Sequence, residues 1–342
     1  MPERFSWNTQ PQPIIALSPM ADMTDSAFCR VVKSITPVST PLVMFREMVS
    51  AEAVVRGNAK TLNMTDIHPD ERPLVQQIFG ADPEMMAEAA AKIYAEHAPE
   101  AFDINMGCPV YKIVHNFNGA ALMREPERAV AIVKAVKAAI PVPLSVKIRT
   151  GWSDGRDCLT FAPTLEAAGA DLITIHGRTK AQGYSGTSDW NRIAEVKKTV
   201  QIPVLANGDI HTPERVEEAL AITGCDGVLI ARGALGNPWF FADTAQLLAH
   251  RTLTPRTFTD RAEVIRRHAM WHLEQYGEHG MKSFRKHLTW YVKGLPFASR
   301  VRESLSSLST LTDLERLLSE IELSTTSKTD STETPEEGRN ET

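Results

Sequence analysis

The stretch LVQQIFGADPEMMAEAAAKIYAEHAPEAFDINMGCP, residues 74–109, holds the pattern that decides the fold. Two short apolar runs, LVQQIF from Leu74 and AFDINM from Ala101, read as strands. Between them, the Ala- and Glu-rich segment PEMMAEAAAKIYAEHA is typical of a helix. This order predicts one strand–helix–strand unit of a parallel sheet.

The same unit recurs along the chain. Further apolar runs bounded by turn residues predict six more strands, which begin at Ile14, Leu42, Leu144, Leu172, Val204 and Gly227. The strand starts recur at intervals of 23 to 43 residues, and PERAVAIVKAVKAAI fills one interval with a helical pattern. Because the strands are too apolar to alternate, eight units predict a (β/α)8 TIM barrel over residues 1–244. A doubly wound sheet is the alternative fold.

A change of pattern near Ala245 predicts a second domain. Helical segments such as RAEVIRRHAMWHLEQYG and DLERLLSEIEL replace the strands, which indicates a C-terminal helical domain over residues 245–323. Between Arg251 and Arg302 there are 11 Lys or Arg against 4 Asp or Glu, with aromatic residues interleaved, in a chain of net charge -5. Residues 324–342 contain no aliphatic or aromatic residue, so we expect a disordered tail there.

Composition narrows the class of protein. The 342 residues are 43% hydrophobic and 23% charged, which is ordinary for a globular chain. No signal-peptide core and no membrane-length apolar run is present, which predicts a cytoplasmic protein without a membrane partner, and we expect a monomer. The four cysteines form no CxxC motif, so the sequence predicts free thiols rather than disulfides or a thiolate metal site.

The residues that close the predicted strands, where a parallel barrel carries its active site, are unusually polar as a set. Helix caps and turns explain any one of the polar residues, but the eight ends together indicate a site. They are Pro19, Met20 and Ala21; Glu47; Gln77; Asn105 with Cys108; Lys147; His176 with Arg178; Asn207, Gly208 and Asp209; and Arg232 with Gly233.

Lys147 lies in an otherwise apolar strand, so its ammonium needs an anionic partner. It could form a Schiff base or face the pyrimidine end of a flavin, whose ring edge Gln77 and Asn207 could pair with. Glycines after the last two strands, with Arg232, predict a site for one phosphate. Since neither GxGxxG nor GxxxxGK[ST] occurs, a mononucleotide fits better than a dinucleotide.

Two histidine patterns have more than one interpretation. His176 could be an ordinary strand-end histidine, but the neighbouring Arg178 favours recognition of an anion or a carbonyl. His268 and His272 have the i, i+4 spacing of a metal pair, but no further ligands occur at suitable spacing. We interpret this pair as residues of a basic helix face and predict no metal.

Taken in order, several segments resemble the tRNA-dihydrouridine synthases, and most closely the bacterial B-type branch. The resemblance runs from about Ile14 to Tyr291. It is carried by SPMADMTDSAF, REMVSAE, DINMGCPVYK with NGAALMREP, VKIRTGW, TIHGRT, IPVLANGDI, GVLIARGALGNPW and FRKHLTWY.

This resemblance implies a flavin-binding barrel followed by a tRNA-binding helical domain. NADPH, or NADH, would reduce bound FMN, which would then reduce the C5=C6 bond of a tRNA uridine, with Cys108 as the proton donor. The implied FMN-binding residues are Pro19, Met20, Ala21, Gln77, Lys147, His176, Asn207, Gly208, Asp209, Ala231 and Arg232. The implied substrate-binding residues are Asn105 and Arg178 in the barrel, and Arg285, Lys286, His287, Trp290 and Tyr291 in the helical domain.

The sequence leaves three alternatives and four departures from the family pattern. The alternatives are an FMN barrel oxidoreductase acting on a free pyrimidine or enone, a Schiff-base lyase using Lys147, and a non-catalytic RNA-binding protein. Tyr111 replaces a frequent basic residue, His115 and Phe117 alter the loop after the cysteine, and Ala231 replaces a frequent glycine. The first three residues bear on which uridine is chosen.

Overall fold

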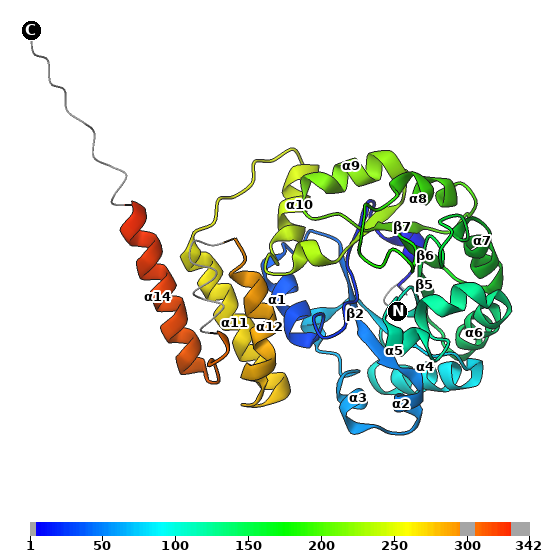
Figure 1. The fold of residues 1–342 in the computed structure, drawn as a ribbon, viewed down its shortest axis with the longest axis horizontal. Coiled ribbons are helices and arrows are strands. Elements are labelled where there is room, and N and C mark those ends of the chain that lie inside the picture. The colour runs from blue at the N-terminus through cyan, green and yellow to red at the C-terminus, as the bar shows by residue number, and fades with distance from the viewer. Residues whose placement is uncertain (1–4, 295–304, 330–342) are drawn as a thin grey trace, which may run out of the picture. The chain divides into compact units, whose positions relative to one another are not determined.

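Eight parallel strands form a closed barrel in the computed structural model, which describes residues 5–294 and 305–329 (Figure 1). Each strand pairs with the next, and the last pairs with the first, which confirms the predicted barrel and excludes the doubly wound sheet. All eight strands begin at the predicted residues. They are β1 (Ile14–Leu17), β2 (Leu42–Ser50), β3 (Leu74–Phe79), β4 (Ala101–Met106), β5 (Leu144–Arg149), β6 (Leu172–His176), β7 (Val204–Asn207) and β8 (Gly227–Ile230).

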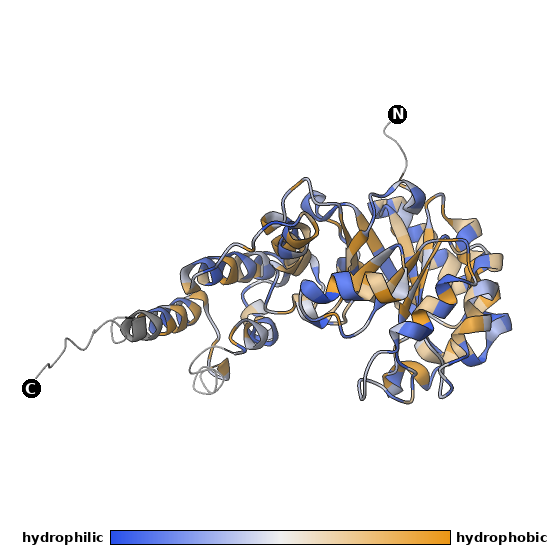
Figure 2. Cartoon of the chain, turned by 90° about the horizontal axis from the view of Figure 1, so that it is seen from above, coloured by the Kyte–Doolittle hydropathy of each residue, from blue (hydrophilic) through white to orange (hydrophobic). Residues whose placement is uncertain are grey.

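Helices cover the outside of the barrel, and the loops after several strands carry short ones. The predicted helical intervals form α4, which Asp82 caps by accepting a hydrogen bond from the amide of Met85, and α6. Figure 2 shows orange strands inside helices that carry both blue and orange residues. The α-helices of this part are α1 (Ser26–Ile35), α2 (Ala51–Val55), α3 (Ala59–Asn63), α4 (Pro83–His97), α5 (Tyr111–Val114), α6 (Pro126–Ala139), α7 (Cys158–Ala168), α8 (Trp190–Lys197), α9 (Glu214–Thr223) and α10 (Phe240–Leu248). The 3-10 helices are η1 (Trp7–Thr9), η2 (Pro69–Glu71), η3 (Gly119–Arg124) and η4 (Arg232–Ala234).

The barrel interior is apolar near the starts of the strands. One cluster of buried side chains includes residues from seven strands, and Trp7 stacks on Phe45 with ring centroids 5.9 Å apart. On β5 the same alternation brings Ser145 and Lys147 inward instead of aliphatic side chains. Polar groups therefore begin halfway up the interior, on a fully packed apolar base.

The chain divides into two compact units. The barrel unit comprises Met1–Ala234 and Pro238–Leu253, and the helical unit comprises Leu235–Asn237 and Thr254–Thr342. The division lies later than the boundary expected at residue 245, because α10 packs against α9 in the barrel unit. The helical unit contains α11 (Phe258–Tyr276), α12 (Gly280–Tyr291) and α14 (Leu311–Thr329), and the predicted helical segments lie in α11 and α14.

The predicted start of the disordered tail, residue 324, lies too early in the chain. Helix α14 continues through Thr329, so residues 324–329 are helical rather than without structure. Once a helix has formed, each added residue gains a hydrogen bond at little further cost, which lets it extend into a polar segment. The rest of the predicted tail, residues 330–342, lies outside the described residues.

None of the helices in the described part of the chain combines the length and the apolar character needed to span a bilayer.

Closure of the barrel between β1 and β8 requires a glycine at position 227, which pairs with Ile14. A Cβ atom at this position would collide with the carbonyl oxygen of Ile14. We expect Gly227→Ala to lower the free energy of unfolding of the barrel by about 1–3 kcal/mol, the usual range for overpacking. Urea unfolding followed by circular dichroism measures this loss. Gly155→Ala is the control, because its new Cβ would make only ordinary contacts at 3.8 Å; equal stabilities of the two variants would contradict the prediction.

Candidate active site

The register of β3, β4 and β5 brings a buried carboxylate to the centre of the polar half of the barrel. Asp103 pairs in register with Gln77 on one side and Ser145 on the other. Its carboxylate accepts hydrogen bonds of 2.6 Å from Gln77 Nε2 and 2.6 Å from Ser145 Oγ. Burial raises the pKa of Asp103 to about 6, although both hydrogen bonds and the charge of Lys147 act in the opposite direction.

From this carboxylate, a chain of hydrogen bonds reaches the cysteine. Gln77 donates to Asp103 with its amide nitrogen, so its Oε1 accepts from Asn105 Nδ2 at 2.9 Å. With its own nitrogen engaged, Asn105 turns Oδ1 toward the amides of Gly107 and Cys108, at 3.1 and 2.9 Å. Each side-chain amide therefore has one defined orientation, and the last one fixes the backbone of the cysteine.

Cys108 lies half-buried just beyond β4, as the sequence predicts. Its carbonyl accepts from the amide of Ala120 at 3.1 Å, and Arg149 Nε donates to the carbonyl of Gly107 at 2.7 Å. Burial raises the pKa of the Cys108 thiol above its ordinary value, and the backbone hydrogen bond from Val110 and the charges of Arg149 and Lys147 only partly oppose this. The thiol therefore stays protonated at neutral pH.

Lys147 lies on β5, and its Nζ donates a hydrogen bond of 3.1 Å to Oδ1 of Asn207 on β7. The expected anionic partner is thus replaced by a neutral amide. Burial, and secondly the charge of Arg149, lower the pKa of Lys147 to about 8. Asn207 in turn donates Nδ2 to the carbonyl of Leu229 at 2.6 Å, so its oxygen is directed at the ammonium. The ammonium can therefore pair with an anion brought by a ligand.

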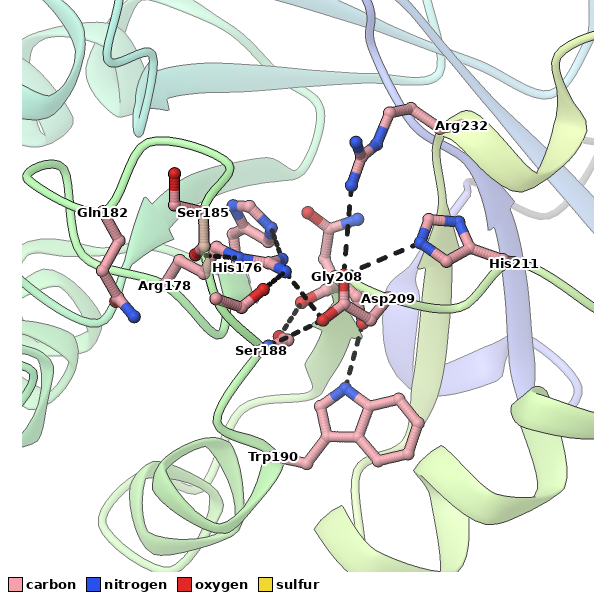
Figure 3. Close-up of polar contacts among 12 residues, drawn as sticks. His176, Arg178, Gln182, Ser185, Ser188, Trp190, Gly208, Asp209, His211 and Arg232 are labelled. Atoms are coloured by element: carbon pink, nitrogen blue, oxygen red, sulfur yellow. Dashed lines mark hydrogen bonds and ion pairs between the residues drawn. The ribbon is translucent and has the colours of Figure 1, made fainter.

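A second cationic region follows β6, β7 and β8 (Figure 3). Asp209 Oδ2 accepts from Arg178 Nη2 at 2.8 Å and from the amide of Ser188 at 2.7 Å. Although burial acts to raise its pKa, these bonds lower the pKa of the Asp209 carboxyl. Arg232 is 3.9 Å from the other carboxylate oxygen and remains 40% exposed. Arg232 is thus the cation of this region best placed to meet an incoming anion.

Arg178, which the sequence predicts to bind substrate, is engaged by groups of the protein itself. It is buried, and it also donates to the carbonyls of Ser185 and Gly186 at 3.0 and 2.5 Å. Three acceptors of the protein itself therefore engage its guanidinium, which holds the loop after β6 in place. Arg178 thereby positions this loop and Asp209, and its predicted contact with the substrate stays a prediction.

His176 is buried and neutral at the end of β6. Burial lowers its pKa to about 2, and the positive charges of Lys147, Arg149, Arg178 and Arg232 act in the same direction. A neutral imidazole can offer or accept a hydrogen bond but cannot act as a cation. The backbone of Gly208, with φ of 110°, lies so close to this ring that a side chain there would collide with it.

The loop after β1 lies at the same end of the barrel. It carries Pro19, Met20 and Ala21, and its contacts are mostly internal, such as the hydrogen bond of 2.8 Å from the amide of Met20 to Thr24 Oγ1. The amide of Asp22 donates to Glu47 Oε2 at 2.6 Å. Ala231 directly follows β8, next to Arg232.

In the helical unit, α12 carries all five residues predicted to contact tRNA. His287 and Tyr291 are buried, and Tyr291 Oη lies 3.1 Å from Nδ1 of His268. Buried rings cannot stack on a base, so we assign these two residues to the core of the helical unit. Arg285 donates to the carbonyl of Leu308 at 2.8 Å, while Lys286 and Trp290 remain half-exposed.

The basic-face interpretation of His268 and His272 is wrong. Both side chains are fully buried, and they pack with His287, with ring centroids 4.5 to 6.3 Å apart. The i, i+4 spacing put both histidines on one face of α11, but this face is the buried one. That no metal binds here stays a prediction.

Sequence reasoning missed several residues of the site. Asp103 and Ser145 lie one alternation below the predicted Asn105 and Lys147, and Arg149 lies one above Lys147. The period of two in a strand puts such residues on one face, so this signal was available. Ser188 and Trp190 gave no comparable signal, because neither lies on a strand. Trp190 begins α8, and its Nε1 donates to the carbonyl of Gly208 at 3.0 Å.

Comparison with known proteins places this arrangement in context. The sequence model of the family described as Dihydrouridine synthase (Dus) matches residues 15–328. A probable tRNA-dihydrouridine synthase 1 of Synechocystis sp. is 40% identical over 305 residues, which cover 88% of this chain and 84% of the relative. The tRNA-dihydrouridine synthase B of Xanthomonas campestris pv. campestris is 36% identical over 307 residues, which cover 87% and 89%. A nitroalkane oxidase of known structure has 17% identity over 66% of each chain and a TM-score of 0.37, too low to inform the site.

The raised pKa of Asp103 predicts a pH-dependent contribution to stability. Because its folded pKa of about 6 exceeds the ordinary value of 3.8, the folded state binds this proton more tightly between those values. The contribution therefore grows as pH falls from about 6 to 4, by at most about 3 kcal/mol, and is lost as pH rises through 6. Asp103→Asn lacks it, so the stability of the wild type minus that of the variant should increase toward acid.

Urea unfolding at a series of pH values measures this difference. Ser145→Ala is a matched variant: it removes a donor that lowers the Asp103 pKa, so the window should move to higher pH. A difference between wild type and Asp103→Asn that stays constant from pH 7 to 4 would show that the carboxyl does not titrate in this range.

Proposed function

The chain belongs to the dihydrouridine synthase family, and we propose that it reduces selected uridines of tRNA to 5,6-dihydrouridine at the carboxyl end of its barrel. FMN would be the bound flavin, and NADPH or NADH the reductant. The observation that carries this proposal is the protonated thiol of Cys108, held by Asn105 at the mouth of a barrel lined with flavin-compatible groups. We also propose that the protein works as a monomer in the cytoplasm, where tRNA is found.

The residues of the barrel fit FMN in charge and shape. Lys147 offers a cation without a carboxylate partner in its hydrogen bond, beside the oriented amides of Gln77 and Asn207. Arg232, with the backbone around Gly208 and Gly233, would hold the phosphate, since both glycines lie where a Cβ would meet neighbouring atoms. Pro19, Met20, Ala21, Asp209 and Ala231 complete the proposed cofactor site, and His176 lies at its edge.

Bound FMN, once reduced, would supply the hydride for C6 of the uracil ring. Cys108 would hold the proton that C5 must receive on the opposite face of the ring. Burial keeps the thiol neutral, so the proton is present when it is needed. Asn105 positions the thiol through the backbone amide, and the neutral His176 offers a hydrogen bond without adding charge.

The helical unit would bind the tRNA body. Its exposed cations and half-exposed Trp290 suit phosphate and base contacts, and Lys293 Nζ lies 5.0 Å from the Trp290 ring centroid. Of the predicted contacts we retain Arg285, Lys286 and Trp290. Binding through phosphates should weaken as salt is raised.

The alternatives are less well supported. A Schiff-base lyase would benefit from the lowered pKa of Lys147, but the ammonium is hydrogen-bonded to Asn207. An FMN oxidoreductase acting on free pyrimidines would need no basic helical unit. Membership of the family favours tRNA over both.

The proposed function is tested with purified protein, FMN, NADPH and tRNA that lacks dihydrouridine. We expect reduction of defined tRNA positions, mapped by mass spectrometry of nuclease fragments, and no reduction of free uridine. Reduction of free uridine at a similar rate would favour the free-pyrimidine enzyme. Trapping of a carbonyl substrate on Lys147 by borohydride would favour the lyase.

Removing the proposed proton donor should slow the reaction with tRNA. In Cys108→Ala we expect oxidation of the reduced flavin by tRNA to fall by about 10²- to 10⁴-fold, the usual contribution of a general acid. Cys225→Ala is the matched control, because Cys225 precedes β8 at the other end of the barrel. Single-turnover absorbance at the flavin band measures both rates; similar rates would remove Cys108 from the mechanism.

The same measurement has a pH signature. Because the neutral thiol is the active form and its pKa is raised, the wild-type rate should hold through neutral pH and fall as the thiol ionises in the alkaline range. Lys147 also loses its charge as pH rises, so a decrease in rate at alkaline pH that persists in Cys108→Ala belongs to groups other than Cys108. A rate that rises with pH as the Cys108 thiol ionises would contradict its assignment as the proton donor.

A further inference from the structure

Three exposed aromatic rings lie in loops at the carboxyl end of the barrel. Tyr111, Phe117 and Tyr184 are 76%, 55% and 61% exposed. They lie in the loops after β4 and β6, the same two loops that carry Cys108 and follow His176. Large apolar rings exposed to water at the mouth of a site are typical of a surface that binds a ligand or partner.

The first loop folds back onto the cysteine. The amide of Ala120 reaches the carbonyl of Cys108, and Gly119 lies so close to Cys108 that a side chain there would collide with it. Phe117, with φ of 58°, precedes by two residues the glycine that packs against Cys108. Tyr111 begins the short helix α5 of this loop, and its ring lies 5.3 Å from that of His115.

Arg149 joins the two loops. Besides Gly107, its guanidinium donates to the carbonyls of Thr179 and Gly183 at 2.9 and 2.8 Å, both in the loop after β6. The ring of Tyr184 lies 5.7 Å from this guanidinium and 5.4 Å from that of Arg232. The three rings thus belong to one connected rim.

Cations accompany the rings. The Arg128 guanidinium lies 5.4 Å from the Phe117 ring centroid, and Arg124 and Lys180 lie 5.1 and 4.5 Å from that of Trp152, in the loop after β5. Lys112 is exposed next to Tyr111. Aromatic rings interleaved with cations match bases interleaved with phosphates. A protein partner would supply no comparable repeat of planar rings and negative charge.

We propose that Tyr111, Phe117 and Tyr184, called here the aromatic rim, bind the nucleotides next to the target uridine by stacking on their bases. The inference rests on the proposed function. A uridine that enters the barrel must leave its stack, which exposes the faces of its neighbours. The rim would cover those faces and help to select the tRNA site that fits.

The experiment compares the affinities of single variants for an unmodified tRNA transcript, by fluorescence anisotropy at one fixed salt concentration. We expect Tyr111→Ala and Phe117→Ala each to weaken binding at least about fivefold, since stacking on one base contributes roughly 1–3 kcal/mol. Tyr111→Phe and Phe117→Tyr, which keep a ring, should retain the wild-type affinity. Val38→Ala is the control, because Val38 is fully exposed in the turn that leads into the start of β2, at the other end of the barrel.

Tyr184→Ala is measured together with flavin content, because Tyr184 also lies near Arg232. Weaker tRNA binding at unchanged flavin content supports the rim, whereas loss of flavin would assign this ring to the cofactor instead. Affinities of the Tyr111 and Phe117 variants within twofold of the Val38 control would overturn the proposal. That outcome is distinct from failure of the proposed function, in which the wild-type protein itself would not form dihydrouridine.

Discussion

The buried carboxylate of Asp103 is the constraint on which the reacting half of the barrel depends. It accepts hydrogen bonds from both neighbouring strands, and the donor on one side, Gln77, can then present only its oxygen to Asn105. Asn105 must in turn direct its own oxygen at the backbone of Cys108. A planar amide has one donor end and one acceptor end, so a single charge at the start of the chain sets every orientation after it.

This polar chain is possible because the lower half of the barrel is apolar and closed. That half is filled by Trp7, Phe45 and aliphatic side chains from seven strands. The strand side chains of this cluster have no polar atoms, so they do not compete for the hydrogen bonds of the polar half. The upper half therefore rests on a packed base of fixed geometry. In the loop above β8, Arg232 remains 40% exposed, which lowers the cost of keeping it charged.

Much of this could be predicted from the sequence, and the failures have physical causes. Apolar runs gave all eight strand starts, and polar residues at strand ends gave Gln77, Lys147 and Asn207. The sequence could not show that Arg178 donates to the carbonyls of Ser185 and Gly186, because backbone carbonyls carry no residue signature. The sequence does not show which face of the basic helix is buried. It therefore predicts RNA contacts for His287 and Tyr291, whose side chains the structure buries.

The separation between strands and loops has a consequence for how such an enzyme can change. The groups that orient Cys108 stand on strands, where each side chain is fixed by its neighbours and a substitution disturbs the whole chain of contacts. The rings of Tyr111 and Phe117 stand on an exposed loop, where most substitutions alter folding stability by only about 0.5 kcal/mol. If the aromatic rim selects the tRNA site as proposed, point mutations in this loop could change the RNA target while the chemistry is kept.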